Sequence, residues 1–340
     1  MQISIITSLF NRLDLTRIFL ESLARTLHGW QYELILIDDA STDGTREFLV
    51  GLDTPHARVV FNETTQGFAA NNNAGANLAQ APLLCFLNND TILLPGWLEP
   101  MARLARLAPE VACVGNVQLV PGSGQINHYG VYFDGDGHPL HAGVGASRAP
   151  TGSYRRWPAV TAACWVVRKE VFLQLGGFDE QFHNGFEDTD FCLRATDAGF
   201  CHFVASRSVI YHHVSASPGR HQHEIQNRAL FRRRWHARLV ADHQARETAR
   251  ERRRDGWRYL CKHRTRPWRY NFRRVCDALN KLQSPVQSSW GLALPTRLRL
   301  RLPAGLQIPV RDVPDSTDST DHRSSTVRPS GSPVQFPAHR

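Results

Sequence analysis

Strand-length apolar runs alternate with helical segments over the first 90 residues, and this order constrains the fold more than any other feature of the chain. The runs are ISIITSLF, YELILID, ARVVFN and PLLCFLN, and the first intervening segment, RLDLTRIFLESLART, has apolar residues at helical spacing. Alternating strands and helices are typical of a parallel sheet with helices on both faces. We therefore predict an α/β fold with a mostly parallel central sheet.

The fourth run ends on Asn88, Asn89 and Asp90, at the edge where sheets of this type bind ligands. One carboxylate with two amides offers the hard oxygen donors that Mg²⁺ and Mn²⁺ prefer. An ordinary Asn-rich turn would explain the same tripeptide without a ligand. These three residues alone therefore leave both interpretations open.

The second run ends on Asp38 and Asp39, and a helix is expected next, with Ser41 or Thr42 as its N-cap. The two acids could simply favour the helix N-terminus. Alternatively, a carboxylate that only accepts hydrogen bonds suits the N3–H of uracil or thymine and rejects cytosine. This interpretation predicts a nucleotide base at the tip of the strand.

A later acidic group, EDTD, places Glu187, Asp188 and Asp190 around the start of another predicted helix. These acids could compensate the helix dipole. A carboxylate crowded by other acids can also have a raised pKa, which suits a general base. The strand VIYHH ends on His212 and His213, and neighbours in a strand point to opposite faces, so at most one faces a given site.

The basic charge of the chain is concentrated in one segment. Residues 228–274 hold 17 of the 40 Lys and Arg but only 4 of the 31 Asp and Glu, so the remainder carries 23 basic and 27 acidic residues. We predict a globular domain over 1–236, an Arg-rich helical extension over 237–283 and a disordered Ser/Thr/Pro-rich tail over 284–340. The basic segment suits an anionic partner, either lipid or nucleic acid.

Cysteine usage and hydropathy indicate a cytoplasmic location. The seven cysteines are irregularly spaced, which favours free thiols in a reducing compartment over a disulfide framework. The N-terminal MQISIITSLF lacks the basic and long apolar regions of a signal peptide, and no apolar run has the length of a membrane span. Membrane contact is therefore expected only at the surface, on the inner face of the plasma membrane.

In their order along the chain, the motifs resemble glycosyltransferase family 2 from about Ile3 to Trp235. LIDDASTDGT, FLNNDT and GGFDEQF followed by EDTDFCLR carry the resemblance, which is greatest to bacterial rhamnosyltransferase-like and O-antigen-type members. It implies a GT-A fold. It also implies an inverting transfer of a sugar from a UDP- or dTDP-activated donor to a hydroxyl of a saccharide or lipid-linked acceptor.

The resemblance also implies roles for individual residues. It makes Asp188 the catalytic base, with Glu187 beside it, and assigns Mg²⁺ or Mn²⁺ to Asp90 and His212. Nucleotide contacts are implied for five residues: Ser8, Phe10, Asp39, Asn71 and Asn88.

The chain departs from the family pattern in several places. Ser8 and Phe10 replace the usual Pro and Tyr, and Asn88 replaces the first acid of the DxD motif, which makes metal binding depend more on the donor diphosphate and on His212. The QxxRW motif of processive enzymes is absent, which argues against a polymer-extruding synthase.

Two alternatives are a sugar-1-phosphate nucleotidyltransferase, which would carry a Gly-rich loop where this chain has TSLFNR, and a non-catalytic binding protein that uses the basic segment. For that segment we favour contact with anionic lipid over nucleic acid, as an addition to the enzyme.

Overall fold

The computed structural model describes residues 1–54, 56–149, 151–214 and 222–262. Its central sheet has the strand order β10-β12-β6-β11-β4-β1-β2-β3. Four neighbouring strands run parallel: β1 (Ile3–Leu9), β2 (Tyr32–Asp38), β3 (Ala57–Phe61) and β4 (Leu83–Leu87). We call them, with the helices between them, the parallel half. The alternation of runs and helical segments predicted all four strands.

The other strands form what we call the mixed half. Here β11 (Cys164–Arg168) runs antiparallel between β4 and β6 (Val111–Leu119), and β12 (Cys201–His212) lies parallel to β6. Shorter strands border them: β5 (Thr91–Leu93) and β10 (Tyr154–Trp157) on β12, β7 (Ile126–His128) on β6, and the separate hairpin of β8 (Val131–Phe133) and β9 (Pro139–His141).

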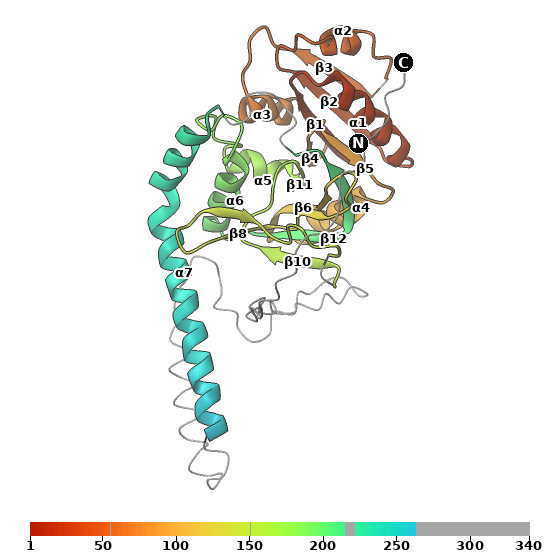
Figure 1. Ribbon diagram of the computed structural model, residues 1–340. Helices are drawn as coiled ribbons and strands as arrows, with labels where there is room; N and C mark the ends of the chain where they lie inside the picture. Colours follow the sequence, from red (N-terminus) through yellow and green to blue (C-terminus); the bar gives the residue numbers. More distant parts are fainter. Residues whose placement is uncertain (55, 150, 215–221, 263–340) are drawn as a thin grey trace, which may run out of the picture. The chain divides into compact units, whose positions relative to one another are not determined.

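Helices cover both faces of the sheet, as predicted (Figure 1). One face carries α1 (Leu13–Thr26), α2 (Thr45–Val50) and α4 (Leu98–Leu107), and the other carries α3 (Phe68–Leu78), α5 (Lys169–Gln174), α6 (Glu187–Asp197) and the start of α7 (Glu224–Lys262). In β4, Leu83, Cys85 and Leu87 enter one core while Leu84 and Phe86 enter the other. This division follows from the two-residue period of a strand.

Helix α7 is continuous from Glu224 to Lys262 and passes the predicted domain boundary at 236 without a break. Phe231, Trp235 and Leu239 recur every four residues and are buried against the core. The predicted extension is thus described as helix as far as 262, while the rest of it and the tail over 284–340 lie outside the described residues. Within the described part of the chain, no helix combines the length and hydropathy that crossing a membrane requires.

The N-cap expected after the second strand is wrong. Helix α2 begins at Thr45, and Ser41 Oγ instead accepts a hydrogen bond from the backbone N–H of Asn11 at 2.8 Å. The backbone N–H of Thr42 donates to Asn11 Oδ1 at 2.8 Å. Ser41 and Thr42 therefore both bond to Asn11, in the loop that follows β1. The helix begins three residues after Thr42, where Asp43 Oδ1 accepts a hydrogen bond from the Thr45 backbone N–H.

Candidate active site

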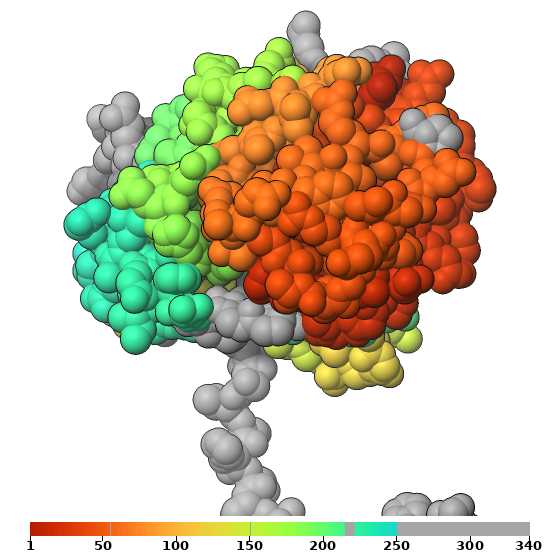
Figure 2. Space-filling view, turned by 90° about the horizontal axis from the view of Figure 1, so that it is seen from above, coloured from red at the N-terminus to blue at the C-terminus, as the bar shows by residue number. Residues whose placement is uncertain are grey.

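A cavity of about 650 Å³ lies beyond the C-terminal ends of β1, β2 and β4, between the parallel and mixed halves. Side chains from both halves line it, including eight of the nine predicted site residues: Ser8, Phe10, Asp39, Asn88, Asp90, Glu187, Asp188 and His212. The two halves meet at one side of it, where Asn184 Oδ1 accepts a hydrogen bond from the backbone N–H of Phe68 at 2.9 Å. In Figure 2 the orange surface of the segment around α3 adjoins the green surface of the mixed half.

Asp39 lines the cavity directly after the end of β2. Its Oδ1 accepts hydrogen bonds from the Gln66 backbone N–H at 2.7 Å and from Asn62 Nδ2 at 3.0 Å, and its Oδ2 accepts from the Gly67 backbone N–H at 3.0 Å. A carboxylate has about four acceptor positions, so three are used and one remains. The side chain is buried and held rigidly, which suits recognition of a single N–H group.

Asn71 is the one predicted residue that does not line the cavity. It is buried behind the wall, where its Nδ2 donates to Ser8 Oγ at 3.0 Å and its Oδ1 accepts from Asn62 Nδ2 at 2.7 Å. Because Asn62 also bonds to Asp39, one amide chain connects Ser8 and Asp39. The geometry thus gives Asn71 a supporting position rather than a direct contact with a ligand.

Asp90 and His212 form a close carboxylate–imidazole pair in the cavity wall, with Oδ1 and Nε2 separated by 3.1 Å. On the other side of the ring, Nδ1 lies 2.8 Å from Oε1 of the fully buried Gln118. Because an amide oxygen only accepts, Nδ1 of a neutral ring carries the proton and Nε2 presents a lone pair to the carboxylate. Nε2 has no hydrogen-bond partner among the described residues.

This donor pair fits a divalent cation. Two ligands at right angles, each about 2.1 Å from a metal ion, are about 3.0 Å apart, close to the observed separation. A metal-binding imidazole usually donates its other N–H to a fixed acceptor, as Gln118 provides here. Of the two candidate histidines, His212 lines the cavity, while the backbone N–H of His213 donates to the backbone oxygen of Asp90 at 2.9 Å.

Asp188 is half-buried in the first turn of α6 and lines the same cavity. Its Oδ2 accepts a hydrogen bond from the Ala162 backbone N–H at 3.0 Å, and its Oδ1 accepts from the backbone N–H and hydroxyl of Thr189 at 2.6 and 3.1 Å. The neighbouring Glu187 is more deeply buried, and its Oε2 accepts from the Gly185 backbone N–H at 2.6 Å. Asp188 is therefore the better placed of the two to meet a substrate.

The third acid of the group, Asp190, has a structural position that the sequence did not reveal. It is fully buried; Oδ1 accepts from Arg234 Nη1 and Trp235 Nε1, both at 2.8 Å, and Oδ2 accepts from Arg194 Nε at 2.8 Å. The bonds from Arg234 and Trp235 join α6 to α7, whereas Arg194 lies on α6 itself. Nothing in the sequence indicates that Arg234 and Trp235 pair with an acid more than 40 residues away.

A short turn before α6 completes the cavity wall. Asn184 and Phe186 have φ angles of 56° and 75°, in the left-handed region. Asn227 of α7 fixes this turn, because its side chain bonds to the backbone N–H and oxygen of His183 at 3.1 and 2.7 Å. Like Gln118, Asn227 is a buried polar residue that a search for catalytic motifs overlooks.

Comparison with known proteins relates the chain to sugar-transferring enzymes. The model of glycosyl transferase family 2 matches residues 4–176. The chain is 34% identical over 244 residues to the uncharacterized protein y4gI of Sinorhizobium fredii, a match that covers 68% of this chain and 26% of the relative. It is 33% identical over 225 residues to the O-antigen biosynthesis protein RfbC of Myxococcus xanthus, covering 64% of this chain and 18% of that protein. The chain therefore spans about a quarter or less of these relatives.

Among solved structures, the fold is similar to that of GalNAc-T7, crystallised with UDP, GalNAc and Mn²⁺. The TM-score is 0.52 at 17% sequence identity, and the match covers 62% of this chain and 43% of the other. At this identity the likeness concerns the fold alone.

Proposed function

Because this chain belongs to glycosyl transferase family 2 and has the GT-A fold, we propose that it is a glycosyltransferase. It would transfer a sugar with inversion from a UDP- or dTDP-sugar to a hydroxyl of a saccharide or lipid-linked acceptor. The observation that carries this proposal is the convergence of three devices in one cavity. They are the rigid acceptor Asp39, the Asp90–His212 pair and the half-buried Asp188.

Asp39 would recognise the base. Its one remaining acceptor position suits the N3–H of uracil or thymine, whereas cytosine presents an acceptor there. Ser8, held by Asn71, and Phe10 would contact the nucleoside beside it, and Asn88 would lie toward the diphosphate.

Asp90 Oδ1 and His212 Nε2 would hold Mg²⁺ or Mn²⁺. When bound, such an ion neutralises the charge that develops on the departing diphosphate. Gln118 keeps the proton of His212 on Nδ1, so that the Nε2 lone pair stays directed at the ion position. With a single carboxylate in the pair, the donor diphosphate would complete the ligand set.

Asp188 would take the proton of the acceptor hydroxyl as that oxygen attacks the anomeric carbon. The bond to the acceptor forms as the bond to the diphosphate breaks, and one such displacement inverts the anomeric configuration. Glu187 is engaged by the Gly185 backbone and would hold the turn instead of acting as a second nucleophile.

Family membership favours sugar transfer over the nucleotidyltransferase alternative. Nothing in the lining of the cavity favours the non-catalytic binding protein over the enzyme. Contact of the Arg-rich extension with an anionic membrane is a separate proposal. Because Leu239 is buried in the core, the test compares the full chain with one ending at Ala249. Equal co-sedimentation of both with anionic liposomes would contradict it.

Calorimetric titration of the full chain with UDP, dTDP, GDP and CDP, each with and without Mn²⁺, tests the proposed function. We expect UDP or dTDP to bind in a Mn²⁺-dependent manner and CDP and GDP to bind at least tenfold more weakly, or about 1.4 kcal/mol. Folded protein that binds none of the four, or binds CDP as well as UDP, would contradict the proposal.

A further inference from the structure

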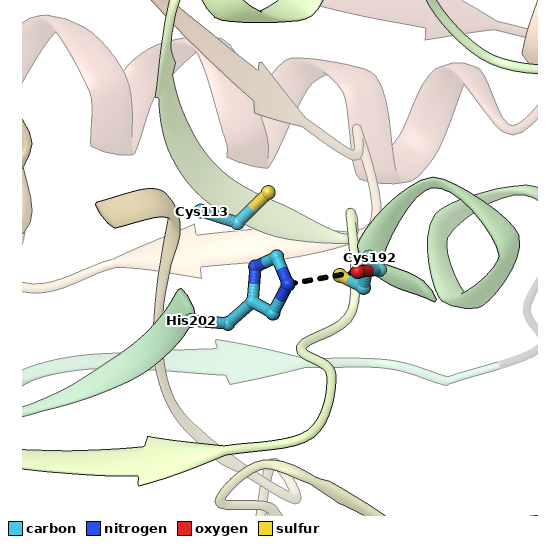
Figure 3. A group of neighbouring side chains, drawn as sticks. All are labelled: Cys113, Cys192 and His202. Carbon is cyan, nitrogen blue, oxygen red and sulfur yellow. Dashed lines mark hydrogen bonds between the residues drawn. The ribbon is translucent and has the colours of Figure 1, made fainter. Parts of the chain in front are cut away.

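A second group of potential metal ligands lies inside the mixed half, away from the cavity. Cys113 of β6, Cys192 of α6 and His202 of β12 come from three different elements, and their ligand atoms all lie within 4.8 Å of one another (Figure 3). Their exposed fractions are 0, 0 and 1%. None of the three lines the candidate active site, so the proposed function does not account for their grouping.

An irregularity of the sheet brings Cys113 to this position. Cys201 pairs with Val111 and Phe203 pairs with Val114, so the single residue His202 lies opposite both Ala112 and Cys113. As a result Ala112 and Cys113, although adjacent, both enter the core under α6, while Val111 and Val114 enter the opposite core. A bulge of this kind redirects a side chain that a regular strand would place on the other face.

His202 is oriented as a metal-binding histidine usually is. Its Nε2 lies 2.9 Å from the backbone oxygen of Cys192 and 3.2 Å from Thr196 Oγ1, so Nε2 carries the proton and donates it to the carbonyl (Figure 3). Nδ1 then has a lone pair, and it is buried with no hydrogen-bond partner in the described residues. Metal-bound histidines typically donate their other N–H to a backbone carbonyl in this way.

The two thiols are neighbours, and burial acts on the pKa of each. Burial raises the pKa of the Cys113 thiol well above its ordinary value, and the adjacent Cys192 acts in the same direction. Burial opposes ionisation of Cys192 as well, but Cys113 and His202 together lower the pKa of Cys192 to about 6. Binding of a cation by both sulfurs would require that both thiols lose their protons.

We propose that Cys113, Cys192 and His202 bind a thiophilic divalent cation, of which Zn²⁺ is the representative, through two thiolate sulfurs and Nδ1. Two thiolates and a neutral imidazole balance the charge of the ion, so the occupied site would be neutral, as a fully buried position requires. Binding Zn²⁺ to the two thiols releases up to two protons. Tetrahedral zinc–sulfur geometry places the sulfurs about 3.8 Å apart, so donors that lie within 4.8 Å of one another would approach by about 1 Å at most. A small exogenous ligand such as water would take the fourth position.

Such an ion would anchor the helix that carries the proposed base. Cys192 lies four residues after Asp188 on α6. An ion bound to Cys192, to Cys113 of β6 and to His202 of β12 would therefore fix the helix one turn from the cavity. The expected contribution is to the stability and alignment of α6. The ion would take no part in the transfer itself.

The test is metal binding by the full chain, purified without metal under reducing conditions. We expect one tightly bound equivalent of Zn²⁺ after gel filtration and, with Co²⁺, the ultraviolet charge-transfer absorption of a thiolate-bound ion. The Cys113→Ser/Cys192→Ser and His202→Gln variants should each lose this equivalent. His202→Gln keeps both thiols, and it decides the question if the double variant does not fold.

The chain contains a matched control. Cys85 and Cys164 form a second pair of neighbouring, fully buried thiols among the described residues. No described histidine, aspartate or glutamate joins them in a potential ligand group. Cys85→Ser/Cys164→Ser and His212→Ala should both retain the Zn²⁺ equivalent, the latter because the cavity pair is a separate site. Wild-type protein that binds no Zn²⁺, or equal loss in the Cys85/Cys164 control, would overturn the proposal whatever the nucleotide titrations show.

Discussion

The parallel and mixed halves hold their cavity residues in different ways. In the parallel half, Asp39 is fixed by backbone N–H groups of Gln66 and Gly67, on the loop that follows the neighbouring strand. In the mixed half, His212 depends on Gln118 of β6, and Asp188 depends on Ala162, just before β11. Asp39 is thus held by the backbone of a single loop that is close to it in sequence. His212 and Asp188 are held by residues of other elements that are far from them in sequence.

This difference predicts that the two halves contribute separately to nucleotide binding and to turnover. Changes in the parallel half should alter nucleotide affinity, whereas changes at Asp188 should alter turnover with little effect on nucleotide binding. Asp90 and His212 join the two halves, because one residue comes from each. The following variants test this division, beginning with the largest expected effect.

Asp188→Asn should lower donor turnover by about 10² to 10⁴-fold, because it removes the proposed base while keeping the side-chain shape. The rate is measured as release of nucleoside diphosphate at saturating donor. Glu187→Gln serves as the neighbouring control and should have a smaller effect. If Asp188→Asn weakened nucleotide binding as much as it slowed turnover, the proposed division would fail.

Asp190→Ala should destabilise the protein by about 1–3 kcal/mol, since it removes a fully buried acceptor and leaves the Nε1–H of the buried Trp235 without its hydrogen bond. Urea unfolding monitors the change. The matched control is Glu21→Ala, which removes an exposed carboxylate from another i,i+4 pair with Arg25 and should cost about 0–1 kcal/mol. Equal losses in the two variants would show that the bonds between α6 and α7 contribute little to stability.

Gln118→Met should weaken Mn²⁺ binding in the presence of UDP by about 10 to 100-fold, because His212 loses the acceptor that fixes its ring. Electron paramagnetic resonance of free Mn²⁺ gives the affinity. Gln118→Glu keeps an acceptor for Nδ1–H and should restore most of it. A similar loss in both variants would mean that packing, not orientation of the imidazole, accounts for the effect.

Asp39→Asn should weaken UDP binding by about 1.5–3 kcal/mol, the range for a hydrogen bond to a charged group. Because an amide can also donate, the variant should bind CDP relatively better than wild type does. Calorimetry with both nucleotides measures the change. Unchanged discrimination between UDP and CDP would remove Asp39 from base recognition.

His128 should make stability depend on pH. Burial lowers its pKa well below the ordinary value, and His141 and His212 add to the effect. The folded state therefore takes up this proton at a lower pH than the unfolded state does. The contribution of His128 to the free energy of unfolding is fully present above about pH 6.5, and below that pH it falls by up to about 1.4 kcal/mol per pH unit. His128→Asn should flatten that slope, while the exposed His28→Asn should not; identical slopes in all three proteins would contradict the assignment.

Sequence patterns predicted the parallel half well, because its strands are consecutive apolar runs separated by helices. They also indicated Asp39, Asp90 and Asp188, which follow strands or open a helix and line one cavity. They could not place β11, whose 164–168 segment inserts antiparallel between β4 and β6. Nor could they reveal Gln118, Asp190 with Arg234, or the bulge at Cys113, since each depends on side chains or strands that are brought together only by folding.

The most direct test of the central claim is calorimetry of UDP or dTDP, whichever wild-type protein prefers, with and without Mn²⁺, on Asp90→Asn and Asp188→Asn. The account predicts that Asp188→Asn keeps the wild-type affinity within about twofold and its dependence on Mn²⁺, whereas Asp90→Asn loses that dependence. Retention of Mn²⁺-dependent binding by Asp90→Asn would contradict the account, because the Asp90–His212 pair would then not hold the metal–diphosphate.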